Sequence, residues 1–152
     1  MNHAKRILLR GFLCLTFLVC SAQTTQRSLL LVAAGDHGLG AVTHAELRKV
    51  FLGVPVTRDN VRLKPLLNST DPLATSIFLQ QVIYMSEREY RRHLVSRVFR
   101  FGDQPPTEYK EIDSLVEGLR STPGSLTFMW SEQFESYEGL ESLGVLWTDS
   151  AE

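Results

Sequence analysis

An uninterrupted apolar stretch at residues 28–34, SLLLVAA, leads directly into a glycine-rich loop and then a helix start. A run of this length and composition is typical of a strand that is buried on both faces, as in a parallel sheet. The loop is Gly35–Gly40, and the helix start is Thr43–Glu46, which matches a capping box because a threonine precedes a glutamate by three positions. We expect this helix to run to about Leu52 and to end at Gly53. A buried strand followed closely by a helix predicts a layered α/β fold.

The same alternation continues along the chain. Asn60–Leu67 alternates apolar and polar residues and predicts a strand, in which Pro65 makes the far half irregular or places it at an edge. Asn68–Pro72 has the cap-forming residues and the proline of a helix start, and this helix should run to about Tyr84 and bury an apolar face. The residues expected on that face are Leu73, Ile77, Phe78, Val82 and Ile83.

The second half of the chain predicts two more helices and two more strands. Ser86–Glu89 is another capping box, and its helix carries a narrow apolar stripe before a Gly-Asp-Gln-Pro-Pro break at residues 102–106. Glu111–Ser121 is amphipathic, Ser125–Trp130 is apolar enough for a strand, and Gly144–Trp147 predicts a short last strand. The expected fold class is α/β, with a mostly parallel sheet flanked by helices. The apolar stripe consists of Tyr90, Leu94, Val98 and Phe101.

The first 22 residues have the order of a cleavable secretory signal peptide. Three bases within the first ten residues precede an uncharged apolar run at residues 11–19. That run is shorter than the roughly 20 residues of a membrane-spanning helix. A small-residue sequence ends at Ala22, so cleavage there leaves residues 23–152 as a single domain.

Both cysteines of the chain, Cys14 and Cys20, lie in this segment, so the mature domain has neither a disulfide nor a thiol. An exported domain without disulfides is more natural in a bacterial periplasm than in an animal secretion, and the periplasm is the expected location. Cys20 leaves one alternative, a lipoprotein attached at a lipobox-like sequence. Val19 disfavours this alternative, because the lipobox has a small residue at that place.

Removal of the signal peptide takes away three bases and changes 16 Lys and Arg against 17 Asp and Glu to 13 against 17, a net charge of −4. Nucleic-acid-binding domains favour a basic patch, so nucleic acid is not an expected partner. The chain has no nucleophile–base arrangement and no cofactor motif, so we expect neither enzymatic activity nor a cofactor. Asp36, His37, His44 and Glu46 lack the spacing of a common metal site and predict a solvated loop and a helix cap.

Four stretches in the same order carry a family resemblance. They are residues 43–53, THAELRKVFLG; residues 61–68, a strand followed by a polar loop; residues 99–106, FRFGDQPP; and residues 122–128, TPGSLTF. Together they resemble the small periplasmic proteins that are related to the phosphate-binding proteins of ABC transporters. The resemblance covers roughly Leu29–Trp147 and implies a single lobe of the periplasmic-binding-protein-like fold.

This resemblance implies an exported substrate-binding-like protein that binds phosphate or a similar small oxyanion for an ABC transporter or a sensor. The candidate ligand-binding residues are Asn68, Ser69, Thr70 and Thr75. Exposed N–H groups and the positive end of a helix dipole can hold an oxyanion at such a helix start, and the hydroxyl groups add donors. The alternative explanation for the same residues is ordinary N-capping, which needs only one of these side chains.

Three places depart from the family pattern. The full-length phosphate binders carry Ser-Gly-Thr where this chain has Pro72, Leu73 and Ala74. The short relatives often have an arginine at the place of Thr75, and the second glycine of the fourth stretch is Thr127. These departures favour an alternative function, a ligand-free interaction module that docks on a membrane sensor or transporter.

Two charged stretches have no assigned role. The helix after Ser86 carries five arginines that would bind an acidic partner or lipid headgroups, or would form a solvated face paired with Glu87 and Glu89. Four glutamates recur every third residue in an exposed polar loop or short helix. The arginines are Arg88, Arg91, Arg92, Arg97 and Arg100, and the glutamates are Glu132, Glu135, Glu138 and Glu141.

Overall fold

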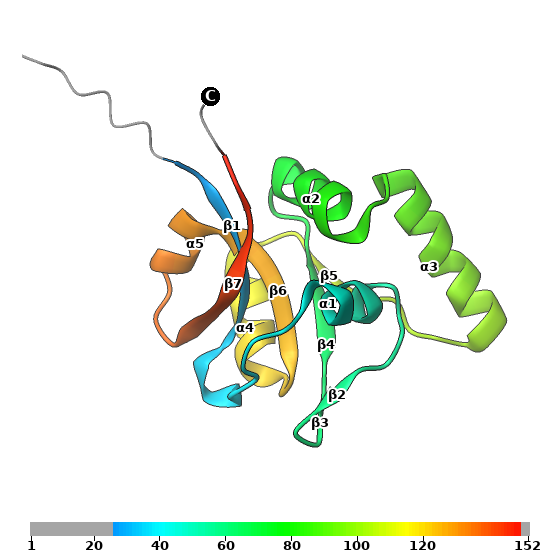
Figure 1. Cartoon of the computed structure of the whole chain (residues 1–152), viewed down its shortest axis with the longest axis horizontal. Coiled ribbons are helices and arrows are strands. Elements are labelled where there is room, and N and C mark those ends of the chain that lie inside the picture. The colour runs from blue at the N-terminus through cyan, green and yellow to red at the C-terminus, as the bar shows by residue number, and fades with distance from the viewer. Residues whose placement is uncertain (1–25, 150–152) are drawn as a thin grey trace, which may run out of the picture.

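A computed structural model describes residues 26–149 (Figure 1). Its centre is a five-stranded sheet with the strand order β5-β4-β6-β1-β7, and β2 and β3 form a separate two-stranded sheet. The signal peptide predicted for residues 1–22, with both cysteines, lies outside the described residues. The strands are β1 (Ser28–Ala34), β2 (Thr57–Arg58), β3 (Val61–Arg62), β4 (Lys64–Asn68), β5 (Thr107–Tyr109), β6 (Ser125–Trp130) and β7 (Leu140–Thr148). The α-helices are α1 (His44–Phe51), α2 (Pro72–Phe78), α3 (Glu87–Phe101), α4 (Ile112–Ser121) and α5 (Ser131–Glu135), with a 3-10 turn, η1 (Gly35–His37), and a π-helical segment, η2 (Leu79–Ile83).

Helices cover both faces of the sheet, so the fold has three layers with a core on each side of the strands (Figure 1). Successive residues of β1 divide between these cores. Leu29, Leu31 and Ala33 face α1, α2 and η2, whereas Leu30 and Val32 face α4. The predicted burial of this strand on both faces is therefore confirmed, because all of its residues after Ser28 are buried.

Four of the five strands point in the same direction. β4 pairs in parallel with β5 and β6, and β7 shares their direction because β1 is antiparallel to both β6 and β7. The predicted α/β lobe with a mostly parallel sheet flanked by helices is confirmed. The expectation that β1 itself would be a parallel strand is wrong. Burial on both faces depends on the helices that cover the sheet, and it does not reveal strand direction.

Both predicted capping boxes are present. Thr43 Oγ1 accepts a hydrogen bond from the backbone N–H of Glu46 at 3.3 Å, and Glu46 Oε2 accepts from the backbone N–H of Thr43 at 2.9 Å. Ser86 and Glu89 form the same pair of bonds at the start of α3, at 3.3 and 2.8 Å. Gly53 follows α1 with a φ of 83°, as expected of a residue that ends a helix.

The strand predicted for Asn60–Leu67 is divided in two, and Pro65 lies inside the main sheet, opposite Leu126 of β6. The backbone N–H of Lys64 donates to the carbonyl oxygen of Gly124, just before β6. Successive residues of a strand direct their backbone nitrogens to opposite sides, so the nitrogen of Pro65 points toward β5. Because β5 pairs with β4 only from Leu66 onward, the missing N–H of proline removes no ladder bond. The sequence did not predict β5, which is three residues long and lacks an apolar run.

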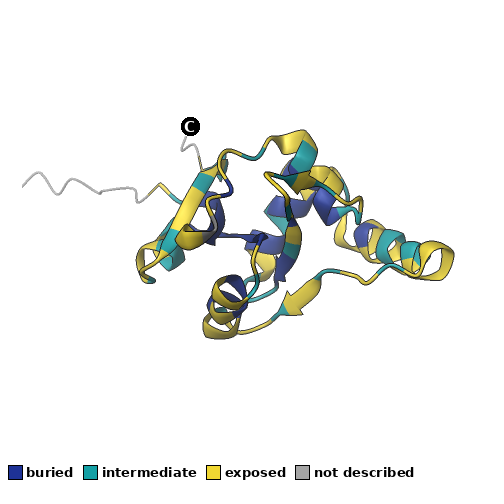
Figure 2. Cartoon of the chain, turned by 90° about the horizontal axis from the view of Figure 1, so that it is seen from below, coloured by how far each residue is buried: buried dark blue, intermediate teal, exposed yellow. Residues whose placement is uncertain are grey.

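Three predicted core residues are exposed instead. Leu73 on α2 is 54% exposed, and on α3 Val98 is 39% and Phe101 65% exposed. The reason for the last two is that α3 extends beyond the sheet, so that only Tyr90 near its start is fully buried (Figure 2). Phe78, Val82 and Ile83 are buried as expected, and β7 begins earlier than the predicted Gly144.

Candidate binding site

The four predicted ligand-binding residues lie together where β4 ends and α2 begins. Asn68 is fully buried at the last position of β4, and its Nδ2 donates to the carbonyl oxygen of Phe128 at 2.8 Å. Its Oδ1 accepts from the backbone N–H of Thr70 at 3.0 Å and from Thr70 Oγ1 at 2.8 Å. Asn68 therefore braces the turn that follows β4, and both ends of its amide group are occupied.

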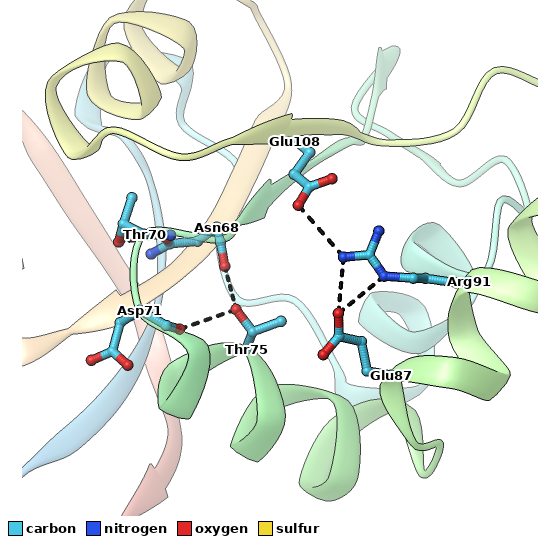
Figure 3. Close-up of polar contacts among 7 residues, drawn as sticks. All are labelled: Asn68, Thr70, Asp71, Thr75, Glu87, Arg91 and Glu108. Atoms are coloured by element: carbon cyan, nitrogen blue, oxygen red, sulfur yellow. Dashed lines mark hydrogen bonds and ion pairs between the residues drawn. The ribbon is translucent and has the colours of Figure 1, made fainter.

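The two other predicted residues, Ser69 and Thr75, also form hydrogen bonds around this turn. Thr75 Oγ1 lies 2.7 Å from the carbonyl oxygen of Asn68 and 3.1 Å from that of Asp71, so its single proton is shared between the two acceptors (Figure 3). The backbone N–H of Ser69 donates to the carbonyl oxygen of Tyr109 in β5 at 2.8 Å. The structure thus brings Asn68, Ser69, Thr70 and Thr75 together as a hydrogen-bonded support for the start of α2.

The N-terminus of α2 is closed by Asp71. Asp71 Oδ1 accepts from the backbone N–H of Leu73 at 2.8 Å, and Oδ2 accepts from the indole N–H of Trp130 at 2.7 Å. Burial raises the pKa of this carboxyl group, but the hydrogen bonds from Trp130, Leu73 and Ala74 outweigh burial and hold the pKa below its ordinary value. A carboxylate therefore stands at the position where an oxyanion would meet the positive end of the helix.

Arg27 contacts Trp130, the partner of Asp71. The guanidinium of Arg27 lies 4.1 Å above the ring of Trp130, and its Nε donates to Glu132 Oε1 at 3.1 Å.

Sequence reasoning identified Asp71 only as part of a helix start and did not connect it with Trp130. The two residues are 59 positions apart, so no local pattern could have joined them.

A cavity of about 330 Å³ lies between η2, α3 and β5, next to the start of α2. Ser69, Thr75 and Arg91 of α3 line it. Figure 3 shows Thr75 and Arg91. Most of the lining is apolar: Leu67, Leu79, Tyr90, Leu94, Val95, Pro105 and Pro106. We call this cavity the α3 groove.

The arginine of the α3 groove is already paired with carboxylates. Arg91 donates to Glu87 Oε1 at 2.9 and 3.0 Å and lies 3.8 Å from Glu108 Oε1 of β5 (Figure 3). The hydrogen bond to Glu87 raises the pKa of Arg91 further. One arginine and two glutamates give this group a net charge of −1, which does not favour an incoming anion.

A second cavity, of about 440 Å³, lies at the opposite ends of β4 and β5. It is lined by the β2–β3 hairpin region, by residues 103–107 and by the basic side chains of Arg62 and Lys64. These two bases precede the predicted oxyanion site in the sequence, but they line this other cavity and not the α3 groove.

Among the described residues, no three His, Cys, Asp or Glu side chains come close enough to hold a metal ion. Glu46 serves the capping box of α1, as predicted. Glu132 belongs to the short helix α5, and its pKa is lowered by its backbone hydrogen bond and by Arg27.

In the described part of the chain, no helix is both long and apolar enough to cross a membrane.

No known family model and no curated protein matches the chain. Among solved structures, the chain is similar to PstS from Borrelia burgdorferi, with a TM-score of 0.54 and 14% sequence identity. The match covers 78% of this chain and 47% of that chain, so this chain spans about half the length of the protein that it resembles. At this identity the likeness shows a periplasmic-binding-protein-like fold, and it does not establish the family that the sequence resembles.

Proposed function

We propose that this chain is a non-enzymatic docking lobe of the periplasm, which binds a membrane sensor or transporter through the α3 groove. The observation that carries this proposal is the start of α2, where the Asp71 carboxylate takes the hydrogen bonds that a bound oxyanion would use. The fold is similar to that of part of PstS, and the start of α2 is already capped by a carboxylate of the protein itself.

Electrostatics oppose a phosphate at that position. An anion about 4 Å from a carboxylate meets a repulsion on the order of 4 kcal/mol at an effective dielectric constant of about 20. A helix terminus returns only about 0.3–2 kcal/mol. The N–H groups of Ser69, Thr70, Leu73 and Thr75 also already donate to protein acceptors. Binding would therefore require the loop to break its own bonds.

The α3 groove suits a side chain of a protein partner. Its apolar lining offers burial, and its rim offers both donors and acceptors through Arg91, Glu87 and Glu108. An apolar centre with a polar rim is the usual composition of a protein–protein contact. Arg91 already pairs with Glu87 and lies near Glu108, so a partner that inserts an apolar side chain leaves no arginine unpaired, and the net charge of −1 stays on the exposed rim.

Photo-cross-linking in intact cells tests this proposal. A photoreactive residue replaces Val95, which lines the groove, and in a matched variant it replaces Val145 of β7; these two valines are 54% and 58% exposed. We expect a discrete adduct with one membrane protein from position 95 and none from position 145. The proposal is wrong if both positions give the same adducts, or if position 95 gives none.

A second function, the binding of a small oxyanion for an ABC transporter, has two observations in its favour. Ser69, Thr75 and Arg91 line the same cavity, and the fold is similar to that of PstS. A ligand that binds only the folded protein must raise its melting temperature. A rise with phosphate or sulfate that Arg91→Gln abolishes would support this function over docking.

A further inference from the structure

The last turn of α3 exposes two phenylalanines. Phe99 is 85% exposed and Phe101 is 65% exposed, although a ring of this size is usually buried in a folded domain. They are two positions apart and therefore point about 200° away from each other around the helix axis. Arg100 stands between them in the sequence. We call Phe99, Arg100 and Phe101 the α3 tip.

The position of the helix makes the α3 tip accessible from outside. α3 projects from the body of the molecule, away from the sheet, and its C-terminal half is mostly exposed (Figures 1 and 2). Gly102 ends the helix in a left-handed conformation, with its N–H bonded to the carbonyl oxygen of Val98. The tip is thus a convex helix end, and its residues line neither of the two cavities described above.

Basic side chains accompany the exposed rings. α3 holds five arginines against two glutamates, a net charge of +3, within a chain whose overall charge is −1. Both glutamates are in the first turn, at the end of the helix far from the tip. Among the described residues, Arg88 and Arg100 form no ion pair.

Two other charged residues near the α3 tip, Arg97 and Asp103, neutralise each other. Arg97 pairs with Asp103, and its guanidinium lies 4.8 Å from the ring centre of Phe101. The carboxylate of Asp103 therefore does not cancel the charge of Arg100. Arg92 lies on the side of Phe99, because residues seven positions apart are two turns apart on one helix face, and it also interacts electrostatically with Glu89.

We propose that the α3 tip inserts its two phenylalanines into the headgroup layer of an anionic lipid membrane, with Arg92 and Arg100 on the lipid phosphates. Aromatic rings beside arginines are the composition that binds such an interface. A convex tip with rings on opposite sides fits a fluid surface that closes around it. A protein surface would need a matching pocket for each ring. The inference does not rest on the docking function, although it would bring the neighbouring α3 groove close to membrane proteins.

Vesicle binding of the purified protein tests the inference. The probes are vesicles of phosphatidylglycerol mixed with phosphatidylcholine, and vesicles of phosphatidylcholine alone. We expect sedimentation with the anionic vesicles only, weakened by added salt because exposed charges are screened. Arg100→Gln should lower the binding constant about fivefold. The double change Phe99→Ser and Phe101→Ser should lower it about tenfold or more.

Matched controls are available on other parts of the surface. Leu73→Ser removes an exposed apolar side chain from α2, and Lys110→Gln removes an exposed charge that is not on α3. Neither should change vesicle binding. All variants share the same N-terminus, so any contribution of the first 22 residues is common to them. The affected side chains are exposed, so every variant should keep its circular dichroism spectrum and melting temperature.

A fluorescent residue in the α3 tip distinguishes insertion of the tip from attachment to the vesicle through another part of the protein. In Phe99→Trp, the added indole should shift its emission to shorter wavelength with anionic vesicles and not with neutral ones. Absence of this shift, or vesicle binding that survives the double serine change, would overturn the inference. If the wild-type protein ignores vesicles but the double change abolishes the adduct formed from position 95, the tip is a protein contact and the membrane proposal is wrong.

Discussion

The indole N–H of Trp130 donates a 2.7 Å hydrogen bond to Oδ2 of Asp71, which ties the last residue of β6 to the start of α2. The other oxygen of this carboxylate caps the helix through the N–H of Leu73. One side chain therefore joins the C-terminal end of β6 to the helix that would present its N-terminus to a ligand. Asp71 therefore supplies, from the protein itself, the negative charge that an added anion would bring to the helix start.

Replacement of Asp71 should separate its capping role from its charge. Asp71→Ala removes the cap, at about 1 kcal/mol, and the bond to Trp130, at about another 1 kcal/mol of unfolding free energy. Asp71→Asn keeps an acceptor for one of these bonds and should lose about half as much. Urea denaturation measures both. Equal losses in the two variants would show that the hydrogen bonds are not the source of the stability.

Acid should destabilise the protein through its capping carboxylates. The pKa of Asp71 is lowered by hydrogen bonds that exceed the opposing effect of burial, and those of Glu46 and Glu89 are lowered by their bonds to Thr43 and Ser86. A lowered folded-state pKa contributes stability above the unfolded value, about 3.9–4.3, and this stability is lost as the pH falls through the folded value. Urea midpoints should therefore fall between pH 5 and pH 3, relative to the roughly constant values expected near neutrality. The fall should be smaller in Asp71→Asn.

Thr75 should prove structural and depend on its hydroxyl. Thr75→Val is close in shape but leaves the buried carbonyl oxygen of Asn68 without this donor, which should lower the unfolding free energy by about 1–3 kcal/mol. Thr75→Ser keeps the hydroxyl and is the control, with a smaller loss. If the valine variant is as stable as the wild type, the bond from Thr75 to the loop contributes nothing.

Two residues of α2 should respond very differently to truncation. Phe78 is fully buried and stacks on Phe128 with ring centres 4.0 Å apart, so Phe78→Ala should cost about 3–5 kcal/mol of unfolding free energy. Leu73→Ala should change the unfolding free energy by less than about 0.5 kcal/mol, because that side chain is more than half exposed. Chemical denaturation of both variants checks the assignment of the buried face, and similar losses would contradict it.

Local patterns predicted the parts of this fold that depend on neighbours in sequence. Thr43–Glu46 and Ser86–Glu89 each form their boxes within four residues, so the bonds that define them are written in the sequence itself. β1 and β6 were visible as apolar runs because both faces are covered by helices. The overall α/β class followed from the alternation of these elements.

The failures concern contacts between distant segments. Nothing near β1 encodes its antiparallel partners, and nothing near β5 shows that its three residues extend a sheet. Leu73 and Phe101 belong to apolar stripes, but their exposure depends on where the neighbouring layer ends. At the candidate site, the sequence placed Asn68, Ser69 and Thr70 at one helix start, whereas the occupation of that helix start by Asp71 depends on Trp130, far along the chain.

If the helix start of α2 is filled by the protein and the lobe acts by docking, phosphate should not bind to it. Isothermal titration of phosphate into the purified wild-type protein measures this. We expect no saturable heat at millimolar phosphate, because the anion would have to displace the Asp71 carboxylate from its hydrogen bonds. Saturable binding with a Kd below about 1 mM, equivalent to about 4 kcal/mol of binding free energy, would contradict it.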